Sequence, residues 1–203
     1  MCRDFNGNSQ GRPGAARAAA PLVEKILALR AGGGRVIAAL DGRCASGKTT
    51  LAGALARDFG WSVVHVDHFF LRPEQRTLER YAQPGGNVDH ERLLEEVLLP
   101  LRRGDAPVYR PFDCRAMRLG EPIPFEPAPV VLVEGSYSCH PALWDCYDVR
   151  AFLTVDPARQ RERIAAREGE ERARTFQEKW IPLEERYFSA FGVERRCDFR
   201  LEL

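Results

Sequence analysis

Hydrophobic residues along this chain fall into two patterns: short continuous runs, and runs in which they recur every three or four positions. Continuous runs bounded by glycine, proline or polar residues are typical of strands buried on both faces. They predict strands at residues 36–40, 61–66, 130–133 and 151–155, with a last short strand at 197–201. The spaced runs predict amphipathic helices at 16–30, 48–59, 90–103 and 157–167.

The order of these elements predicts the fold class. Short apolar strands that alternate with helices form βαβ units, whose right-handed crossovers build a parallel sheet with helices on both faces. We therefore expect an α/β protein. The length of 203 residues suits a single domain, which we place at residues 16–203.

Four segments lack a regular pattern. Residues 1–15 contain almost nothing that can be buried, and we expect a disordered tail there. Residues 69–86 are polar and interrupted by proline and glycine, which predicts a surface excursion able to carry substrate contacts. Residues 107–112 favour a short edge strand, and four prolines between 122 and 129 favour an extended connection.

Composition narrows the class of protein. The chain is 44% hydrophobic and 29% charged, and 30 Lys plus Arg residues against 29 Asp plus Glu residues give a net charge of +1. This balance disfavours a dedicated nucleic-acid binder, because neutralising phosphates needs a basic face. No apolar run approaches the roughly 20 residues of a membrane span, and no signal-peptide pattern precedes the first helix. We expect a cytoplasmic protein without a membrane partner.

The spacing of the cysteines also fits a cytoplasmic protein. The six cysteines are scattered without a C-x-x-C pair, at Cys2, Cys44, Cys114, Cys139, Cys146 and Cys197. This spacing fits neither a disulfide framework nor a zinc site, so we expect reduced thiols with structural roles.

The strongest local signal is Gly-Arg-Cys-Ala-Ser-Gly-Lys-Thr at residues 42–49, which matches G-x-x-x-x-G-K-[ST] between a predicted strand and a predicted helix. In such a phosphate loop (P-loop), backbone N–H groups bind phosphate oxygens, Lys48 lies along the β- and γ-phosphates, and Thr49 offers its hydroxyl to Mg²⁺. We expect Lys48 to be exposed. The expected nucleotide-binding residues are Gly42, Arg43, Cys44, Ala45, Ser46, Gly47, Lys48, Thr49 and Thr50.

Two acidic residues stand where strands end. Asp67 closes the strand at 61–66, and Glu134 closes the strand at 130–133. Because the carboxyl ends of parallel strands line the ligand crevice, both carboxylates should point toward the γ-phosphate. The alternative for each is a helix cap or a loop hydrogen bond. No N-K-x-D segment is present, which disfavours a guanine-nucleotide switch.

With these residues in place, the chain resembles the uridine kinases and their P-loop relatives, which include phosphoribulokinase and pantothenate kinase. The resemblance covers most of residues 35–203 and rests on the order and spacing of its motifs. These are the P-loop, Val66-Asp67-His68-Phe69-Phe70, Gly86-Asn87-Val88-Asp89-His90, Pro107-Val108-Tyr109 followed by Phe112, Val133-Glu134-Gly135, and Val155-Asp156-Pro157 before an arginine-bearing segment.

The resemblance implies transfer of a phosphoryl group from ATP to a primary hydroxyl, which is the 5′-hydroxyl of a nucleoside in the name-giving members. It implies that Asp67 is the general base, that Glu134 helps to hold Mg²⁺, and that Asp89 binds ribose hydroxyls. Phe70, Tyr109 and Phe112 would complete the substrate site, with packing as the alternative for the last two. The chain departs from the family at Phe70, where a tyrosine is usual, and at Arg110-Pro111, which separates Tyr109 from Phe112.

An arginine-rich segment begins within the helix predicted at 157–167. Arg159, Arg163 and Arg167 recur every four positions, so they share one helix face, and Arg172 and Arg174 follow. Interleaved glutamates make a solvated, ion-paired face one interpretation. The other is a lid at about residues 163–178 that brings Arg163 and Arg167 to the transferred phosphoryl group, as related P-loop kinases do.

The leading hypothesis is thus a small-molecule kinase that uses ATP and Mg²⁺, with a nucleoside as acceptor. A kinase of another hydroxylated metabolite is the first alternative, and a regulatory protein that binds and slowly hydrolyses ATP is the second. Sequence leaves open the acceptor, ATP against GTP as donor, homo-oligomerisation, the role of the tail and the redox sensitivity of Cys44.

Overall fold

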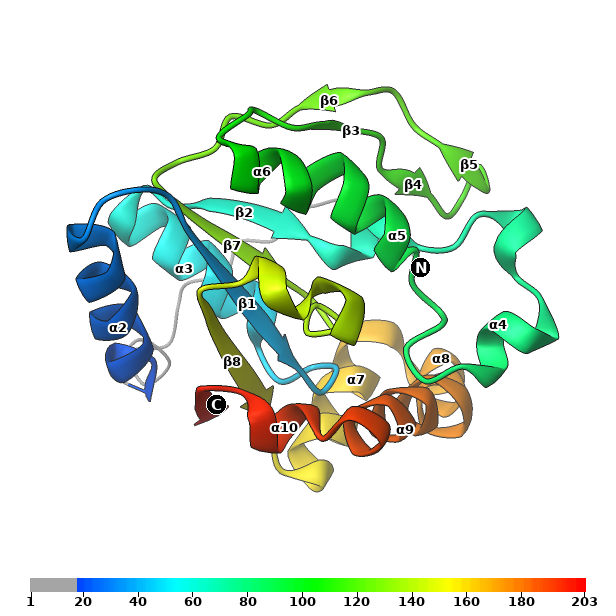
Figure 1. Ribbon diagram of the computed structural model, residues 1–203. Helices are drawn as coiled ribbons and strands as arrows, with labels where there is room; N and C mark the ends of the chain where they lie inside the picture. Colours follow the sequence, from blue (N-terminus) through cyan, green and yellow to red (C-terminus); the bar gives the residue numbers. More distant parts are fainter. Residues whose placement is uncertain (1–17) are drawn as a thin grey trace.

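A central sheet of five strands organises the protein, for which a computed structural model describes residues 18–203. Its order is β2-β7-β1-β8-β9, and each neighbouring pair is parallel. The strands are β1 (Val36–Gly42), β2 (Ser62–His65), β7 (Val130–Glu134), β8 (Val149–Thr154) and β9 (Phe199–Glu202). Helices cover both faces of this sheet (Figure 1), which confirms the α/β class. The expected tail and the first two residues of the expected helix at 16–30 lie outside the described residues.

Alternate residues of β1 pack on opposite faces of the sheet. Val36, Ala38 and Leu40 belong to a core with helices α2 (Ala20–Ala31) and α3 (Lys48–Phe59). Ile37 and Ala39 belong to a second core, with the helices of the other face. A strand buried on both sides explains why this segment reads as a continuous apolar run.

The second face carries most of the remaining helices. They are α5 (His90–Leu93), a π-helical turn η3 (Leu94–Leu98), α6 (Leu99–Arg103), a 3₁₀ turn η4 (Pro141–Cys146), α9 (Ile181–Phe191) and α10 (Val193–Arg196). The segment that contains the predicted lid comprises α7 (Pro157–Glu168), α8 (Glu170–Thr175) and a π-helical turn η5 (Phe176–Trp180), which leads into α9. Residues 163–178, predicted as a lid, begin within α7 and end within η5.

The edge strand predicted at 107–112 is divided into two short strands, neither of which joins the central sheet. It forms β3 (Val108–Tyr109) and β4 (Phe112–Asp113), which pair with β6 (Ile123–Pro124) and β5 (Arg118–Leu119) in two small antiparallel ladders. Pro111, which lacks an N–H donor, separates the two pieces. The connection predicted at 122–129 is therefore partly a strand.

The surface excursion contains short helical turns. The strand predicted at 61–66 ends at His65, and a 3₁₀ turn η1 (Val66–Phe69) follows. The excursion then contains η2 (Pro73–Gln75) and α4 (Leu78–Ala82). These turns connect the end of β2 to α5.

Two sequence expectations concern the protein as a whole. Of the six cysteines expected to be reduced, Cys44, Cys139, Cys146 and Cys197 form no disulfide, and Cys2 lies outside the described residues. Among residues 18–203, no helix is long and apolar enough to cross a membrane.

Candidate active site

The P-loop connects β1 to α3 in an unusual backbone conformation. Gly42 and Gly47 have φ angles of 133° and 101°, and Ala45 has a φ of 57°. A Cβ atom on Gly42 would lie 1.9 Å from the carbonyl oxygen of Leu153, so only glycine fits there. Among the described residues no side chain caps the start of α3. The first N–H groups of this helix, which lack intrahelical acceptors, can therefore receive an anion.

Lys48 is 8% exposed, so the expectation of an exposed lysine was wrong. Its ammonium group donates to the carbonyl oxygens of Gly42 and Arg43, at 2.7 and 2.9 Å, and to Ser136 Oγ at 3.3 Å. These contacts use all three N–H donors of the lysine. The loop folds over its own lysine and supplies acceptors that phosphate oxygens can replace.

Thr49 and Glu134 meet beside the loop, as the expected magnesium site requires. The Thr49 hydroxyl lies 3.2 Å from both carboxylate oxygens of Glu134, which is 4% exposed. Within residues 18–203, no three His, Cys, Asp or Glu side chains are grouped to hold a metal by themselves. The pairing of one hydroxyl with one carboxylate suits Mg²⁺, which typically binds one or two protein groups together with substrate phosphates and water.

His65 is a partner of Glu134 that sequence analysis missed. Its Nδ1 lies 2.5 Å from Glu134 Oε1, and the two residues are register partners on adjacent strands β2 and β7. The imidazole and the Thr49 hydroxyl thus both contact the Glu134 carboxylate. Only the strand order, which the sequence does not reveal, brings them together.

Asp67 lies in η1, immediately past β2. Its side chain is exposed to solvent. Desolvation by the neighbouring protein, together with the negative charge of Glu134, raises the pKa of the Asp67 carboxyl, while the positive charge of Lys48 acts in the opposite direction. A carboxylate with a raised pKa is a better proton acceptor than an ordinary aspartate.

The first half of the P-loop is held by side chains from distant elements. The Arg43 guanidinium pairs with Glu185 at 2.7 Å and with Glu194 at 3.1 Å. Gln160 of α7 donates to the carbonyl oxygen of Cys44 at 3.0 Å. Burial raises the pKa of the Cys44 thiol, which disfavours the reactive thiolate and fits the structural role expected of the cysteines.

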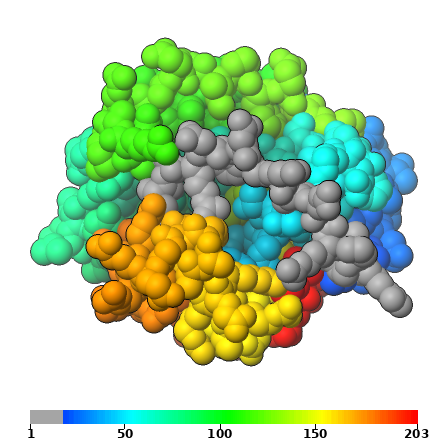
Figure 2. Space-filling model, turned by 180° about the vertical axis from the view of Figure 1, so that it is seen from behind, coloured from blue at the N-terminus to red at the C-terminus, as the bar shows by residue number. Residues whose placement is uncertain are grey.

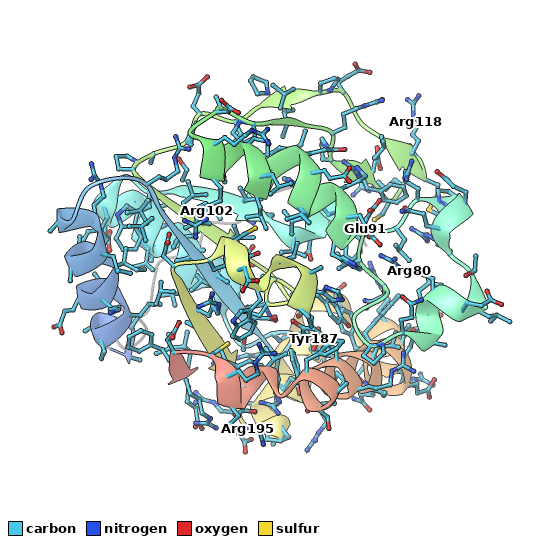
Figure 3. All side chains as sticks on the ribbon, viewed as in Figure 1. Arg80, Glu91, Arg102, Arg118, Tyr187 and Arg195 are labelled. Atoms are coloured by element: carbon cyan, nitrogen blue, oxygen red, sulfur yellow. The ribbon has the colours of Figure 1, made fainter. Side chains whose placement is uncertain are left out.

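Asp41, the residue before the loop, is a buried anchor that sequence analysis also missed. Its carboxylate accepts hydrogen bonds from the backbone of Gly42, Tyr137 and Cys139, and from the hydroxyl of Tyr187 at 2.8 Å. Tyr187 lies near the centre of the molecule in Figure 3. Tyr137 has a φ of 75°, a strained value for an aromatic residue. Asp41 thus fixes the turns that follow both β1 and β7.

The predicted lid arginines have different surroundings. Arg163 donates to the carbonyl oxygens of Ala45 and Leu203, both at 3.1 Å, so it rests on the P-loop. Arg167 pairs with Glu168 and stacks over Phe176. Its positive charge acts to lower the pKa of Asp67. In Figure 2 the predicted lid, yellow and orange, lies opposite the green segment around residues 105–125, with cyan residues visible between them.

Asp89 is fully buried at the start of α5. Its Oδ1 accepts from the backbone N–H of Arg92 at 3.2 Å, whereas Oδ2 has no hydrogen-bond partner among the described residues. The Arg72 guanidinium lies 3.6 Å from Oδ2. A buried carboxylate oxygen without a donor is costly unless a ligand supplies one.

Tyr109 and Phe112 are 4% and 2% exposed, whereas Phe70 is partly exposed. The Tyr109 hydroxyl lies 3.1 Å from Nδ1 of His68, and its ring packs against Phe69. Burial and the nearby His65 lower the pKa of His68 to about 4, so His68 is neutral near pH 7. In this conformation both aromatic rings behave as core residues, the alternative that the sequence left open.

Comparison with known proteins identifies the family. No family model matches the sequence. A uridine kinase from Staphylococcus haemolyticus (strain JCSC1435) is 30% identical over 151 residues, which cover 70% of this chain and 72% of the relative. The chain belongs to the uridine kinase-like family.

Solved structures show the same fold as this uridine kinase-like protein. A "possible uridine kinase" from Bacillus stearothermophilus has a TM-score of 0.67 at 20% identity, covering 92% of this chain and 98% of the other. D-glycerate 3-kinase from Cryptococcus neoformans var. grubii has a TM-score of 0.61 at 17% identity, covering 86% and 88%. Identities this low show the fold alone. The family relationship, together with this fold, makes the chain a kinase.

Proposed function

We propose that this protein transfers the γ-phosphoryl group of ATP, with Mg²⁺, to a primary hydroxyl of a nucleoside. The observation that carries the proposal is the gathering of four groups with separate roles beside one P-loop. These are the amine of Lys48, the hydroxyl of Thr49 and the carboxylates of Glu134 and Asp67. A regulatory nucleotide binder has no need of the Asp67 carboxylate as a base.

The residues present fit both ATP and Mg²⁺. The uncapped start of α3 and the backbone of residues 42–50 suit the phosphates, and the contact between Thr49 and Glu134 suits the metal. Thr49 and Glu134 would hold Mg²⁺, which would supply positive charge to neutralise the phosphates. Lys48 would exchange its carbonyl partners for phosphate oxygens, and Arg163 and Arg167 would add positive charge from the lid.

Asp67 would accept the proton of the attacking hydroxyl. Its raised pKa fits that role, and its solvent-open position leaves room for an acceptor. Proton acceptance orients the hydroxyl oxygen toward the phosphoryl group, which is the main task of the base in such transfers.

Asp89 supports the choice of a ribose. Its Oδ2 has the Arg72 guanidinium at 3.6 Å but no hydrogen-bond donor among the described residues, so it can accept a hydrogen bond from a sugar hydroxyl, while Oδ1 caps α5. We assign the rest of the acceptor site to Phe70, Tyr109 and Phe112. These residues belong to the family motifs that come before and after Asp89 in the sequence. Exposure of a ring face of Tyr109 or Phe112 to a base would require movement of the segment 107–125.

The burial of the Tyr109 and Phe112 rings favours a second candidate, a kinase of a smaller hydroxylated metabolite. Such an acceptor needs Asp89 and Asp67 but no aromatic wall. The glycerate kinase of the same fold acts on a small acceptor of this kind.

Steady-state kinetics with MgATP distinguish the two candidates. We expect turnover of uridine, cytidine or adenosine, and values of kcat/KM at least about tenfold lower for the 2′-deoxy forms. Asp89→Ala should remove that preference, and Asp89→Asn, which still caps α5, separates a folding defect from lost recognition. Turnover of glycerate or a sugar, with none of any nucleoside, would reject the nucleoside and retain the kinase.

A further inference from the structure

Glu184 of α9 connects two parts of the active site that are far apart in the sequence. Its Oε2 accepts a hydrogen bond from the backbone N–H of Cys44 in the P-loop, at 2.9 Å. Its Oε1 accepts from the hydroxyl of Ser136, which follows β7, at 2.8 Å. Ser136 Oγ in turn accepts from the ammonium group of Lys48. One carboxylate therefore fixes both the loop backbone and a partner of the loop lysine.

The position of the hydroxyl hydrogen of Ser136 supports this connection. The hydroxyl lies within reach of Glu184 at 2.8 Å and of the Gly42 carbonyl oxygen at 3.1 Å, but it has one hydrogen to donate. The shorter contact to a carboxylate is the stronger one. Ser136 Oγ is then left with its lone pairs toward Lys48.

Packing does not explain a carboxylate at this position. Glu184 is only 6% exposed, and burial raises its pKa while the charge of Lys48 acts in the opposite direction. Helix α9 is already anchored in the core by Tyr187 and Phe188. A buried carboxylate is costly, so its two well-formed hydrogen bonds indicate a role at the P-loop.

We propose that Glu184 is a positioning residue for nucleotide binding, which holds the Cys44 amide directly and Lys48 through Ser136. The proposal rests on the proposed use of ATP. Glu184 itself touches neither substrate nor metal. Glu184 keeps the loop in its binding conformation. The entropic cost of ordering the loop when the nucleotide binds is therefore smaller.

Two substitutions separate the hydrogen bonds of Glu184 from its charge. Glu184→Ala removes both contacts. Glu184→Gln retains them, because the amide oxygen can accept from Cys44 and the amide N–H₂ can donate to Ser136, whose hydroxyl hydrogen then turns to Gly42. Glu24→Ala, at an exposed glutamate on the far helix α2, is the matched control.

The experiment is calorimetric titration of each folded variant with a non-hydrolysable ATP analogue and Mg²⁺, well below the unfolding temperature. We expect the Kd to rise about tenfold in Glu184→Ala and to stay within about threefold of the parent in Glu184→Gln and Glu24→Ala. Hydrogen exchange of the peptide spanning residues 42–49, without nucleotide, should accelerate only in Glu184→Ala.

The outcomes separate this inference from the proposed function. Parent-like Kd and exchange in Glu184→Ala would overturn the positioning role and leave ATP use intact. Equal losses in Glu184→Ala and Glu184→Gln would also overturn it, because the charge and not the contacts would matter. A parent protein that binds no ATP analogue would overturn both proposals. A lower unfolding temperature with unchanged Kd would reduce Glu184 to a structural residue.

Discussion

Thr49 and Glu134 are in direct contact, 3.2 Å apart, although 85 positions separate them in the sequence. The parallel pairing of β1 with β7 creates this contact. Glu134 is the register partner of Leu40, two residues before the P-loop, so the end of β7 lies beside the first turn of α3. The sheet order thus builds the expected metal site from one residue of each segment.

Replacement of Lys48 tests the P-loop. We expect Lys48→Ala to abolish phosphoryl transfer, because the charge that stabilises the transferred group is lost. Unfolding in urea should show a loss of about 1–2 kcal/mol, since buried carbonyl oxygens lose a donor. Lys25→Ala, at an exposed lysine of α2, should match the parent in both assays. Parent-like turnover by Lys48→Ala would show that the loop is not the donor site.

Replacement of Asp67 tests the general base. Asp67→Asn should lower kcat by about 10²–10⁴, the usual contribution of a positioned base, and change ATP affinity much less. Rapid-quench kinetics with a saturating acceptor measure this effect. Unchanged kcat would assign proton acceptance to another group.

Replacement of Glu134 should produce a different defect. In Glu134→Gln the carboxylate charge beside Thr49 is lost, so the Mg²⁺ concentration for half-maximal activity should rise roughly tenfold. Titration of activity with Mg²⁺ measures this, and Glu121→Gln, at an exposed position, is the control. If this variant lost kcat at every Mg²⁺ concentration while Asp67→Asn altered the Mg²⁺ requirement, the two roles would have to be exchanged.

The partly buried ring of His140 predicts how stability depends on pH. Burial, with a further contribution from the charge of His90 when protonated, lowers the pKa of His140 to about 4. Its unfolded value is about 6.5, so below that pH the unfolded chain binds a proton that the folded protein does not. Stability contributed by the neutral ring is therefore lost as the pH falls from about 6.5 to about 4.

The variant His140→Asn isolates this contribution. Asparagine can still accept from the N–H of Ala142, as His140 does at the start of η4, but it does not titrate. Between pH 7 and pH 4.5 the parent should lose about 1–2 kcal/mol more unfolding free energy than the variant, after allowance for solvent screening. Parallel pH profiles from urea unfolding would contradict the prediction.

The sequence was sufficient to predict the parts of the structure that depend on residues close together in the chain. The strand at 36–40, the loop and the helix at 48–59 lie next to each other in the chain, and their pattern predicted them closely. A doubly buried strand reads as a continuous apolar run, and the loop motif needs glycine for its backbone angles. These features depend on neighbouring residues alone.

The contacts that steady the loop could not be predicted in this way. Glu184 and Gln160 reach Cys44 from 140 and 116 positions away, and no local pattern distinguishes them from other polar residues of their helices. The partnership of His65 with Glu134 depends on strand order in the same way. The burial of Lys48 follows from the folding of the loop over its own side chain, which a motif does not encode.

The central claim is that the γ-phosphoryl group reaches an alcohol. The most direct test follows the label of [γ-³²P]ATP, with Mg²⁺, in the presence of ribonucleosides, glycerate and sugars, using the parent and Asp67→Asn. We predict label in a phosphorylated small molecule for the parent and a loss of about 10²–10⁴ for the variant. Label that appears only as inorganic phosphate with every acceptor, equally in parent and variant, would contradict the account and indicate a regulatory ATPase.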